Sequence, residues 1–330
     1  MEHNPVLKET NVLTIGTKCM VFKEYHNQIK ELRKAIRLSV YHKTLYGQCL
    51  DSFKEHTSII KKAETKLRKV GSGKDETLPE NLAHLLSDWI NSKNIKSQKR
   101  RQDLVKTKLM QISSIEIHAF LKDRVDSLWE EKRLFKGLLT QEKRAIERLE
   151  NELRATDDPK ASSVIPFIIS VENLTIDQEE TENIYNLGSN ALGKLKTSIK
   201  SLSSIAETPI SQIENNSNEG QIAYNAFFTS VQAYMYLCAF KNELSQYADN
   251  RDLQLHLDSL KDFMTSFINY LVLDWTEHDK IRQSLLYLRK TENITEALLK
   301  GLNSKITKIK SELSLTSQEL NAILTRMDLN

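Results

Sequence analysis

The sequence predicts an all-α protein, an elongated bundle of four to five long, coiled-coil-like helices. Two observations favour this fold class: a heptad repeat near the C-terminus and a scarcity of residues that interrupt helices. The chain of 330 residues contains only 9 Gly and 5 Pro, well below the average usage of about 7% and 5%. Charged residues make up 28% and aromatic residues 7%, which is typical of helices with narrow apolar seams and wide solvated faces.

The C-terminal repeat is the strongest signal in the sequence. Steps of alternately three and four residues from Leu257 reach Met327, and 16 of the 21 positions visited are apolar. This spacing predicts one long helix whose seam is buried against other long helices. The polar positions of the seam include Asp274, His278 and Glu292. They indicate either a polar layer that sets helix register or a pH-sensitive buried contact.

The first half of the chain predicts a flexible tail and a helical hairpin. Residues 1–16 form the tail, a helix is expected over 17–70, and a second over 79–155, so that the hairpin occupies 17–156. Between them, Gly71–Pro79 is rich in turn residues. Ten residues separate the seam positions Ile36 and Tyr46, the spacing of a stammer, which overwinds a coil locally. The motif GSGK at residues 71–74 lacks the other residues of a phosphate-binding loop.

The second half predicts a connector followed by an acidic helical half. Residues 157–178 contain an apolar run interrupted by Pro166, which is typical of an extended connector or, alternatively, of a wedge entering a bilayer. Helices are expected over 179–206 and again after Gln221, where aromatic side chains occupy most faces. The segment 179–330 ends in the long C-terminal helix. We expect the hairpin, connector and acidic half to form one continuous elongated domain.

Charge is unevenly placed along the chain. The net charge is +3, but residues 1–160 carry 32 Lys+Arg against 23 Asp+Glu, and residues 161–330 carry 15 against 21. This asymmetry indicates either a polyanionic partner for the first half or neutralisation between the two halves inside the fold.

Motifs for catalysis or metal binding are lacking. The eight histidines form no HExxH pattern, and Cys19, Cys49 and Cys238 have no metal-ligand spacing. We therefore predict no enzyme, no cofactor and no metal site. The cysteines are interpreted as small core residues of a reducing compartment. The N-terminus has no secretory pattern, and no apolar run is long enough to span a membrane.

A basic patch is the candidate functional site. Its cations lie on both sides of the Gly71–Pro79 turn, where Arg68 and Lys74 accompany them. Three interpretations stay open: a solvated face, a contact with anionic lipid, or a contact with nucleic acid. Nucleic acid is less favoured because no aromatic side chains interleave the cations to stack on bases. The candidate residues are Lys61, Lys62, Lys66, Lys69, Lys93, Lys96, Lys99, Arg100, Arg101, Lys106 and Lys108.

The hairpin order, the interrupted seam and the cations near a helix junction together resemble the BAR superfamily of membrane-curvature modules. The local likeness lies in residues 267–290, FINYLVLDWTEHDKIRQSLLYLRK, which are similar to the aromatic-then-basic helix of the sorting-nexin type. The resemblance covers helix pattern only, and no lipid-recognition domain precedes the helices. It implies a crescent-shaped antiparallel homodimer on a cytosolic membrane face.

The sequence thus favours a non-enzymatic helical scaffold, BAR-like, that binds and shapes membranes in intracellular trafficking. The alternative is a coiled-coil subunit of a cytoskeletal, kinetochore or tethering complex. Either function predicts a homo- or hetero-oligomer formed through the long helices, and the first adds an anionic membrane surface as partner. The expected localisation is cytoplasmic, peripheral on intracellular membranes.

Overall fold

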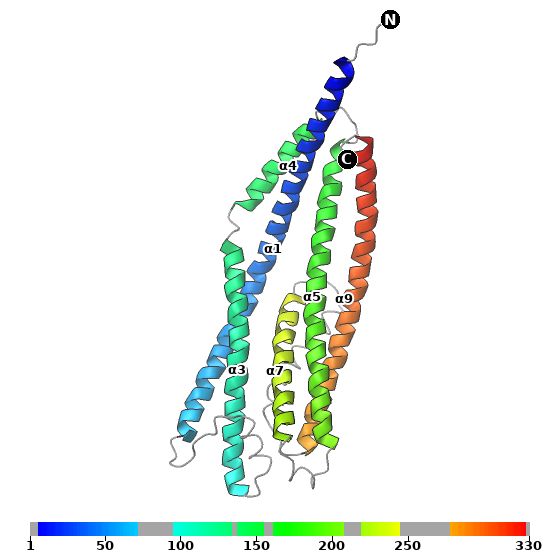
Figure 1. The fold of residues 1–330 in the computed structure, drawn as a ribbon. Coiled ribbons are helices and arrows are strands. Elements are labelled where there is room, and N and C mark those ends of the chain that lie inside the picture. The colour runs from blue at the N-terminus through cyan, green and yellow to red at the C-terminus, as the bar shows by residue number, and fades with distance from the viewer. Residues whose placement is uncertain are drawn as a thin grey trace. The chain divides into compact units, whose positions relative to one another are not determined.

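A computed structural model describes residues 6–71, 95–133, 137–154, 161–207, 219–244 and 278–327. This part of the chain is helical throughout apart from turn residues at 137 and 327, which confirms the predicted fold class. In chain order the helices are α1 (Val6–Gly71), α3 (Ile95–Arg133), α4 (Leu138–Arg154), α5 (Ala161–Glu207), α7 (Glu219–Leu244) and α9 (His278–Arg326) (Figure 1). At 1.5 Å per residue, the 66 residues of α1 extend about 100 Å.

The chain divides into two compact units. The first comprises Met1–Thr44, Leu128–Asn183 and Asn303–Asn330, and the second comprises Leu45–Ser127 and Ile184–Leu302. Each unit contains its own hydrophobic core. The helices α1, α3, α5 and α9 supply residues to both units.

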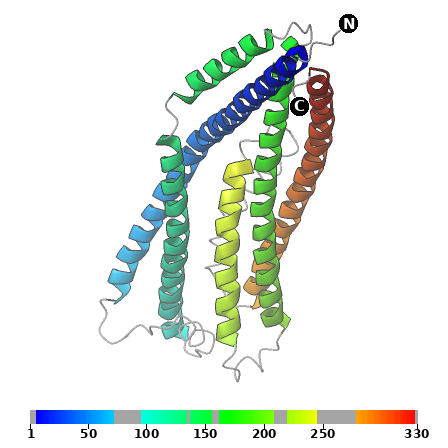
Figure 2. The same cartoon turned by 45° about the horizontal axis from the view of Figure 1, so that its top comes forward.

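The core of the first unit lies among α1, α4, α5 and α9. Figures 1 and 2 show α4 beside the N-terminal half of α1, and α5 beside α9. Along α1 and α5 the paired residue numbers rise together, from His26 with Glu172 to Lys34 with Glu179, so these helices run parallel. The buried residues of this core are Phe22, Ile29, Leu32, Ala145, Leu149, Leu153, Val164, Ile165, Ile168, Leu320 and Leu324.

The core of the second unit brings α1, α3, α5, α7 and α9 together. The helices α5 and α7 are antiparallel, because Ser198 meets Ser230 while Gly188 meets Phe240. Gly188 lies close to both neighbouring helices: a Cβ at this position would lie 2.8 Å from the Phe240 ring and 2.9 Å from Leu299. A larger residue fits here only if the Phe240 or Leu299 side chain shifts.

The C-terminal seam is confirmed wherever the structure describes it. In α9 and the turn residue that follows it, every described seam position from Leu285 to Met327 is buried or half-buried, and Leu288 and Leu302 are each 1% exposed. Two threonines at the same interface, Thr291 and Thr295, are fully buried, and their hydroxyls donate to the carbonyls of Tyr287 and Thr291. The seam positions 257–277, including Asp274, lie outside the described residues.

Two predicted segments fold differently from the expectation. The chain is helical from Val6, so residues 6–16 are not the predicted tail, and Gly16 is accommodated inside α1. Residues 161–178 belong to α5 and are not an extended connector. Although Pro166 costs about 3 kcal/mol inside a helix, it lies on the exposed face. Val164, Ile165 and Ile168 are buried around it, and each contributes about 1.5–3 kcal/mol.

The helix predicted over 79–155 is interrupted. Gly137 has a backbone φ of +102°, which no right-handed helix contains, and its carbonyl accepts the first hydrogen bond of α4, from the Gln141 amide at 3.1 Å. At the start of this new helix Leu139 is 66% exposed, whereas Ala145, Leu149 and Leu153 are buried.

The predicted interruption of the first seam coincides with a polar core position. Ser39 is buried at 6%, and the seam resumes at Leu45, one residue before the predicted Tyr46. The boundary between the two units falls in α1 between Thr44 and Leu45. The seam before the interruption therefore belongs to the first unit, and the seam after it belongs to the second.

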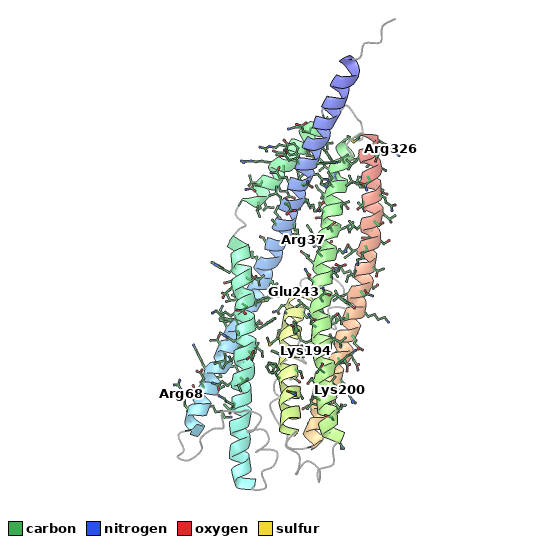
Figure 3. All side chains as sticks on the ribbon, viewed as in Figure 1. Arg37, Arg68, Lys194, Lys200, Glu243 and Arg326 are labelled. Atoms are coloured by element: carbon green, nitrogen blue, oxygen red, sulfur yellow. The ribbon has the colours of Figure 1, made fainter. Side chains whose placement is uncertain are left out.

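Ion pairs inside the two units neutralise part of the positive charge of the first half of the chain. In the first unit Arg37 pairs with Asp177 and Glu180, and in the second Arg124 pairs with Glu243. Figure 3 labels Arg37 on α1 and Glu243 on α7. These pairs join the basic first half of the sequence to its acidic second half, as one of the two interpretations predicted.

Candidate functional site

The predicted basic residues of α1 form an exposed stripe near the C-terminal end of that helix. Lys61, Lys62, Lys66 and Lys69, called the lysine stripe below, all lie in the last three turns and are all exposed. The helix is held here by its other side, where His56 and Ala63 are 3% and 6% exposed. The sequence places apolar residues on one face and lysines on the other, so burial of the first presents the second to solvent.

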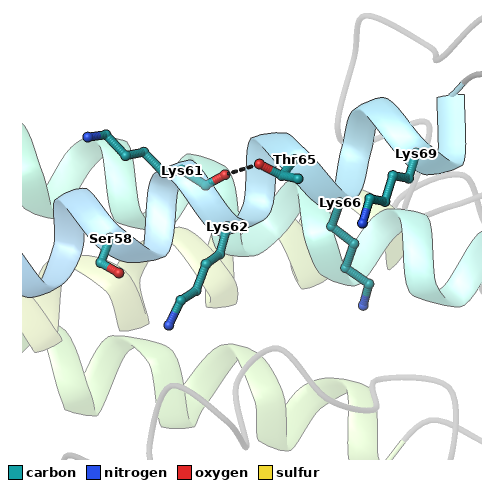
Figure 4. A pocket seen from close by; sticks show the side chains of 6 residues that line it. All are labelled: Ser58, Lys61, Lys62, Thr65, Lys66 and Lys69. Carbon is teal, nitrogen blue, oxygen red and sulfur yellow. Dashed lines mark hydrogen bonds between the residues drawn. The ribbon is translucent and has the colours of Figure 1, made fainter.

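The stripe borders an open depression of about 370 Å³. Besides the four lysines, Ser58 and Thr65 line it, and no carboxylate does within the part of the chain that the structure describes. Figure 4 shows Lys62 and Lys66 extending to the same side of α1 as the Ser58 hydroxyl, while Lys61 points to the other side. The Thr65 hydroxyl donates to the Lys61 carbonyl at 2.8 Å and is therefore engaged within the helix.

The helix dipole accounts for only part of this concentration of cations. Arg68 and Lys69 occupy the last turn of α1, where a cation gains about 0.3–1 kcal/mol from the exposed carbonyls. Lys61 and Lys62 lie more than two turns before the end, beyond the reach of that effect. Their positions are thus not explained by helix stability.

The stripe differs in its pairing from the basic residues that lie between helices. Arg33 donates to Glu142 at 2.8 Å, and Lys34 binds Glu179 at 2.8 Å; this hydrogen bond raises the pKa of Lys34. By contrast, Lys61, Lys62 and Lys66 have no carboxylate of the described residues within ion-pair distance. Three adjacent exposed ammonium groups therefore remain available to an external anion.

The second group of predicted cations is described only in part. Lys93 lies outside the described residues, and the backbone of α3 carries Lys96, Lys99, Arg100, Arg101 and Lys106, whose side chains are likewise not described. Lys108 is half-buried, and its ammonium group donates to Gln111 at 3.2 Å. Lys108, which alone in this group has a described side chain, does not line the depression beside the lysine stripe. A joint patch stays a prediction.

The polar seam residues do not gather into a site within the described residues. Glu292 is half-buried on α9, and the side chain of His278 is not described. Among the described residues, no group of three or more His, Cys, Asp or Glu side chains is placed to hold a metal ion. The turn at residues 72–79, with most of the GSGK motif, lies outside them.

Sequence reasoning missed a buried polar layer of the second unit. His56 is packed edge-on against Tyr234, Asn242 donates to the Cys49 sulfur at 3.9 Å, and Arg124 reaches Glu243. Burial, followed by the charge of His118, lowers the pKa of His56 to about 4. Burial also raises the pKa of the Cys238 thiol to about 12. Cys49 and Cys238 are free and buried, as predicted.

The comparisons with known proteins returned no relative. No protein-family model, curated protein or solved structure matches the chain. The structure shows an all-helical protein with long helices. The resemblance to the BAR superfamily stays a hypothesis. No helix within the described ranges combines the length and apolar character needed to cross a bilayer.

Proposed function

We propose that this protein is a non-enzymatic helical scaffold that binds an anionic membrane surface through the lysine stripe at the end of α1. The observation that supports the proposal is the pairing pattern. Arginines and lysines between helices are matched with carboxylates, as in Arg33 with Glu142, whereas Lys61, Lys62 and Lys66 face outward with no described carboxylate partner.

The expected energy is sufficient for peripheral binding. A lysine near an acidic leaflet contributes about 1 kcal/mol, so Lys61, Lys62 and Lys66 together contribute about 3 kcal/mol, or more than a hundredfold in partitioning. Because exposed charges are screened within about 8 Å at physiological ionic strength, binding should weaken steeply as salt is added.

Beyond membrane binding, we propose that the protein has a BAR-like role in membrane shaping and intracellular trafficking. The long helices of both units support it, together with the resemblance of residues 267–290, of which 278–290 form the first turns of α9. In such a role the chain acts as an antiparallel homodimer, and a rigid helix end carries the basic stripe to the bilayer.

Co-sedimentation with vesicles tests the proposal. The full chain should pellet with vesicles containing phosphatidylserine and remain in solution with neutral phosphatidylcholine vesicles. The triple reversal Lys61→Glu, Lys62→Glu, Lys66→Glu should weaken binding more than a hundredfold, since about 1 kcal/mol is lost for each lysine. The matched control reverses three other exposed lysines of the same helix, Lys23, Lys30 and Lys54, and should bind nearly as the unaltered protein does.

Equal binding by both triple variants would remove the lysine stripe from the proposal. Failure of the unaltered chain to bind anionic vesicles at low salt would end it altogether.

The second candidate function, a coiled-coil subunit of a larger complex, has less support. This candidate was suggested by the long apolar seam of the C-terminal helix. The described part of that seam, from Leu285 to Met327, already packs against other helices of the same chain. The seam therefore does not require another protein to cover it. A stable heteromeric partner recovered with the full chain, together with no vesicle binding, would favour this candidate instead.

A further inference from the structure

We propose that the depression beside the lysine stripe is a binding site for the phosphomonoester headgroup of a phosphorylated lipid. The inference rests on the proposed function and adds ligand selectivity to it. It predicts that the stripe recognises concentrated phosphate charge and is not merely attracted to an acidic bilayer.

Four of the residues that line the depression form a short row along α1. Ser58, Lys62, Lys66 and Lys69 recur at intervals of four, four and three residues, so all four lie on one face of α1. With a rise of 1.5 Å per residue, Lys62 and Lys69 are separated by about 10 Å along the helix axis. The depression of about 370 Å³ falls within the range of roughly 300–1,000 Å³ that is usual for small-ligand sites.

The chemistry of the lining selects an anion of high charge density. Lys62 and Lys66 present two strong cationic donors to the same side of the helix, and the Ser58 hydroxyl lies on that side too (Figure 4). Among the described residues that line the depression, none is a carboxylate that would compete for these donors. The ammonium group of lysine binds phosphate as a point charge.

A phosphomonoester, with a charge near −2 at neutral pH, is favoured over a singly charged phosphodiester. Coulomb attraction grows with the product of the charges and falls with distance. Two cations one helical turn apart therefore gain more from one dianion between them than from two monoanions spread over the bilayer. A generic contact would show no such preference, because it depends only on surface charge density.

Vesicles matched in surface charge provide the test. One set contains phosphatidylcholine with a phosphatidylinositol bisphosphate, and the other contains phosphatidylcholine with enough phosphatidylserine to give the same zeta potential. We expect the full chain to bind the bisphosphate vesicles at least tenfold more tightly. Soluble inositol trisphosphate should compete with these vesicles at a concentration that leaves phosphatidylserine binding unchanged.

Two pairs of lysine substitutions test whether the preference for the bisphosphate vesicles depends on the lysine stripe. Lys62→Gln with Lys66→Gln should lose about thirtyfold in affinity for the bisphosphate vesicles, because two contacts of about 1 kcal/mol each are removed. The same pair of substitutions should also abolish the preference. The control, Lys23→Gln with Lys30→Gln, neutralises two exposed lysines elsewhere on α1 and should keep the preference.

The outcomes separate this inference from the proposed function. Equal binding to both charge-matched vesicles would overturn the headgroup site and leave peripheral membrane binding standing. Loss of binding to both kinds of vesicle in the control variant, or a preference that survives in Lys62→Gln with Lys66→Gln, would also overturn it. If the unaltered chain binds neither kind of vesicle, the proposed function fails together with the inference.

Discussion

Protonation of a single buried histidine should make the second unit sensitive to mild acid. His56 is 3% exposed, and its Nδ1 has no hydrogen-bond partner within the described structure. Tyr234 of α7 packs edge-on against its ring at 6.1 Å, and His118 of α3 acts electrostatically on His56. Burial, with a smaller contribution from His118, lowers the pKa of His56 from 6.5 to about 4.

The sign and size of the effect follow from proton linkage. The unfolded chain takes up a proton at His56 as the pH falls through about 6.5, whereas the folded chain does not until about pH 4. Stability is therefore complete above about pH 6.5 and decreases between these two values. The full difference of about 2.5 pKa units corresponds to about 3 kcal/mol, of which about 2 kcal/mol is already lost at pH 5.

The assay is urea unfolding followed by circular dichroism, with native-state hydrogen exchange of the α7 amides as a local readout of the second unit. Unaltered protein should lose about 2 kcal/mol more than His56→Gln between about pH 7.5 and pH 5. His118→Gln should keep most of the pH dependence, with the loss reduced slightly. The reasoning is refuted if the unaltered protein and His56→Gln lose the same stability over that interval.

Four further single substitutions and one double variant test the packing. Gly188→Ala should lower the unfolding free energy by about 1–3 kcal/mol, because its methyl group meets a ring carbon at 2.8 Å. Gly193 lies on the same helix, and a Cβ at this position would meet nothing within 4 Å. Gly193→Ala should therefore raise the unfolding free energy by about 1 kcal/mol in the same urea titration. Arg124→Ala should cost about 3 kcal/mol in thermal unfolding, because Glu243 is left buried without its cation, and Arg124→Met combined with Glu243→Leu should recover most of the loss. Pro166→Ala should stabilise α5 by about 3 kcal/mol, and increased amide exchange in residues 161–170 would contradict this.

The helical class and the seam of α9 were predictable because they depend on local periodicity. A repeat of three and four residues needs no knowledge of the partner helix, and each described position from Leu285 onward is buried or half-buried as predicted. The exposure of the lysine stripe followed from the same rule, since lysines opposite an apolar face are turned to solvent.

Other features of the fold were not accessible in this way. Pro166 was interpreted as a helix breaker, but its neighbours Val164 and Ile168 are fully buried, and tertiary packing compensates for the lost hydrogen bond. The end of the helical stretch at Gly137 was overlooked because a single glycine is tolerated inside many helices, and only its positive φ shows that the chain turns there.

The candidate site shows the same division. The sequence was sufficient to show that lysines concentrate near the end of α1. It was not sufficient to show that Arg33, Arg37 and Arg124 are matched with carboxylates while Lys61, Lys62 and Lys66 are not. The pairing depends on residues separated by more than one hundred positions, such as Arg33 and Glu142, which no local pattern joins.

The sequence by itself determined that this chain is helical, which faces of its helices are apolar, and where its cations are concentrated. All of these depend on residue types at spacings within a few turns of one helix. Only the tertiary structure decided which helices meet, that their contacts form two units, and which charges are neutralised inside them. Those outcomes depend on shape and charge complementarity between segments far apart in the chain, as the close approach of Phe240 and Leu299 at Gly188 illustrates.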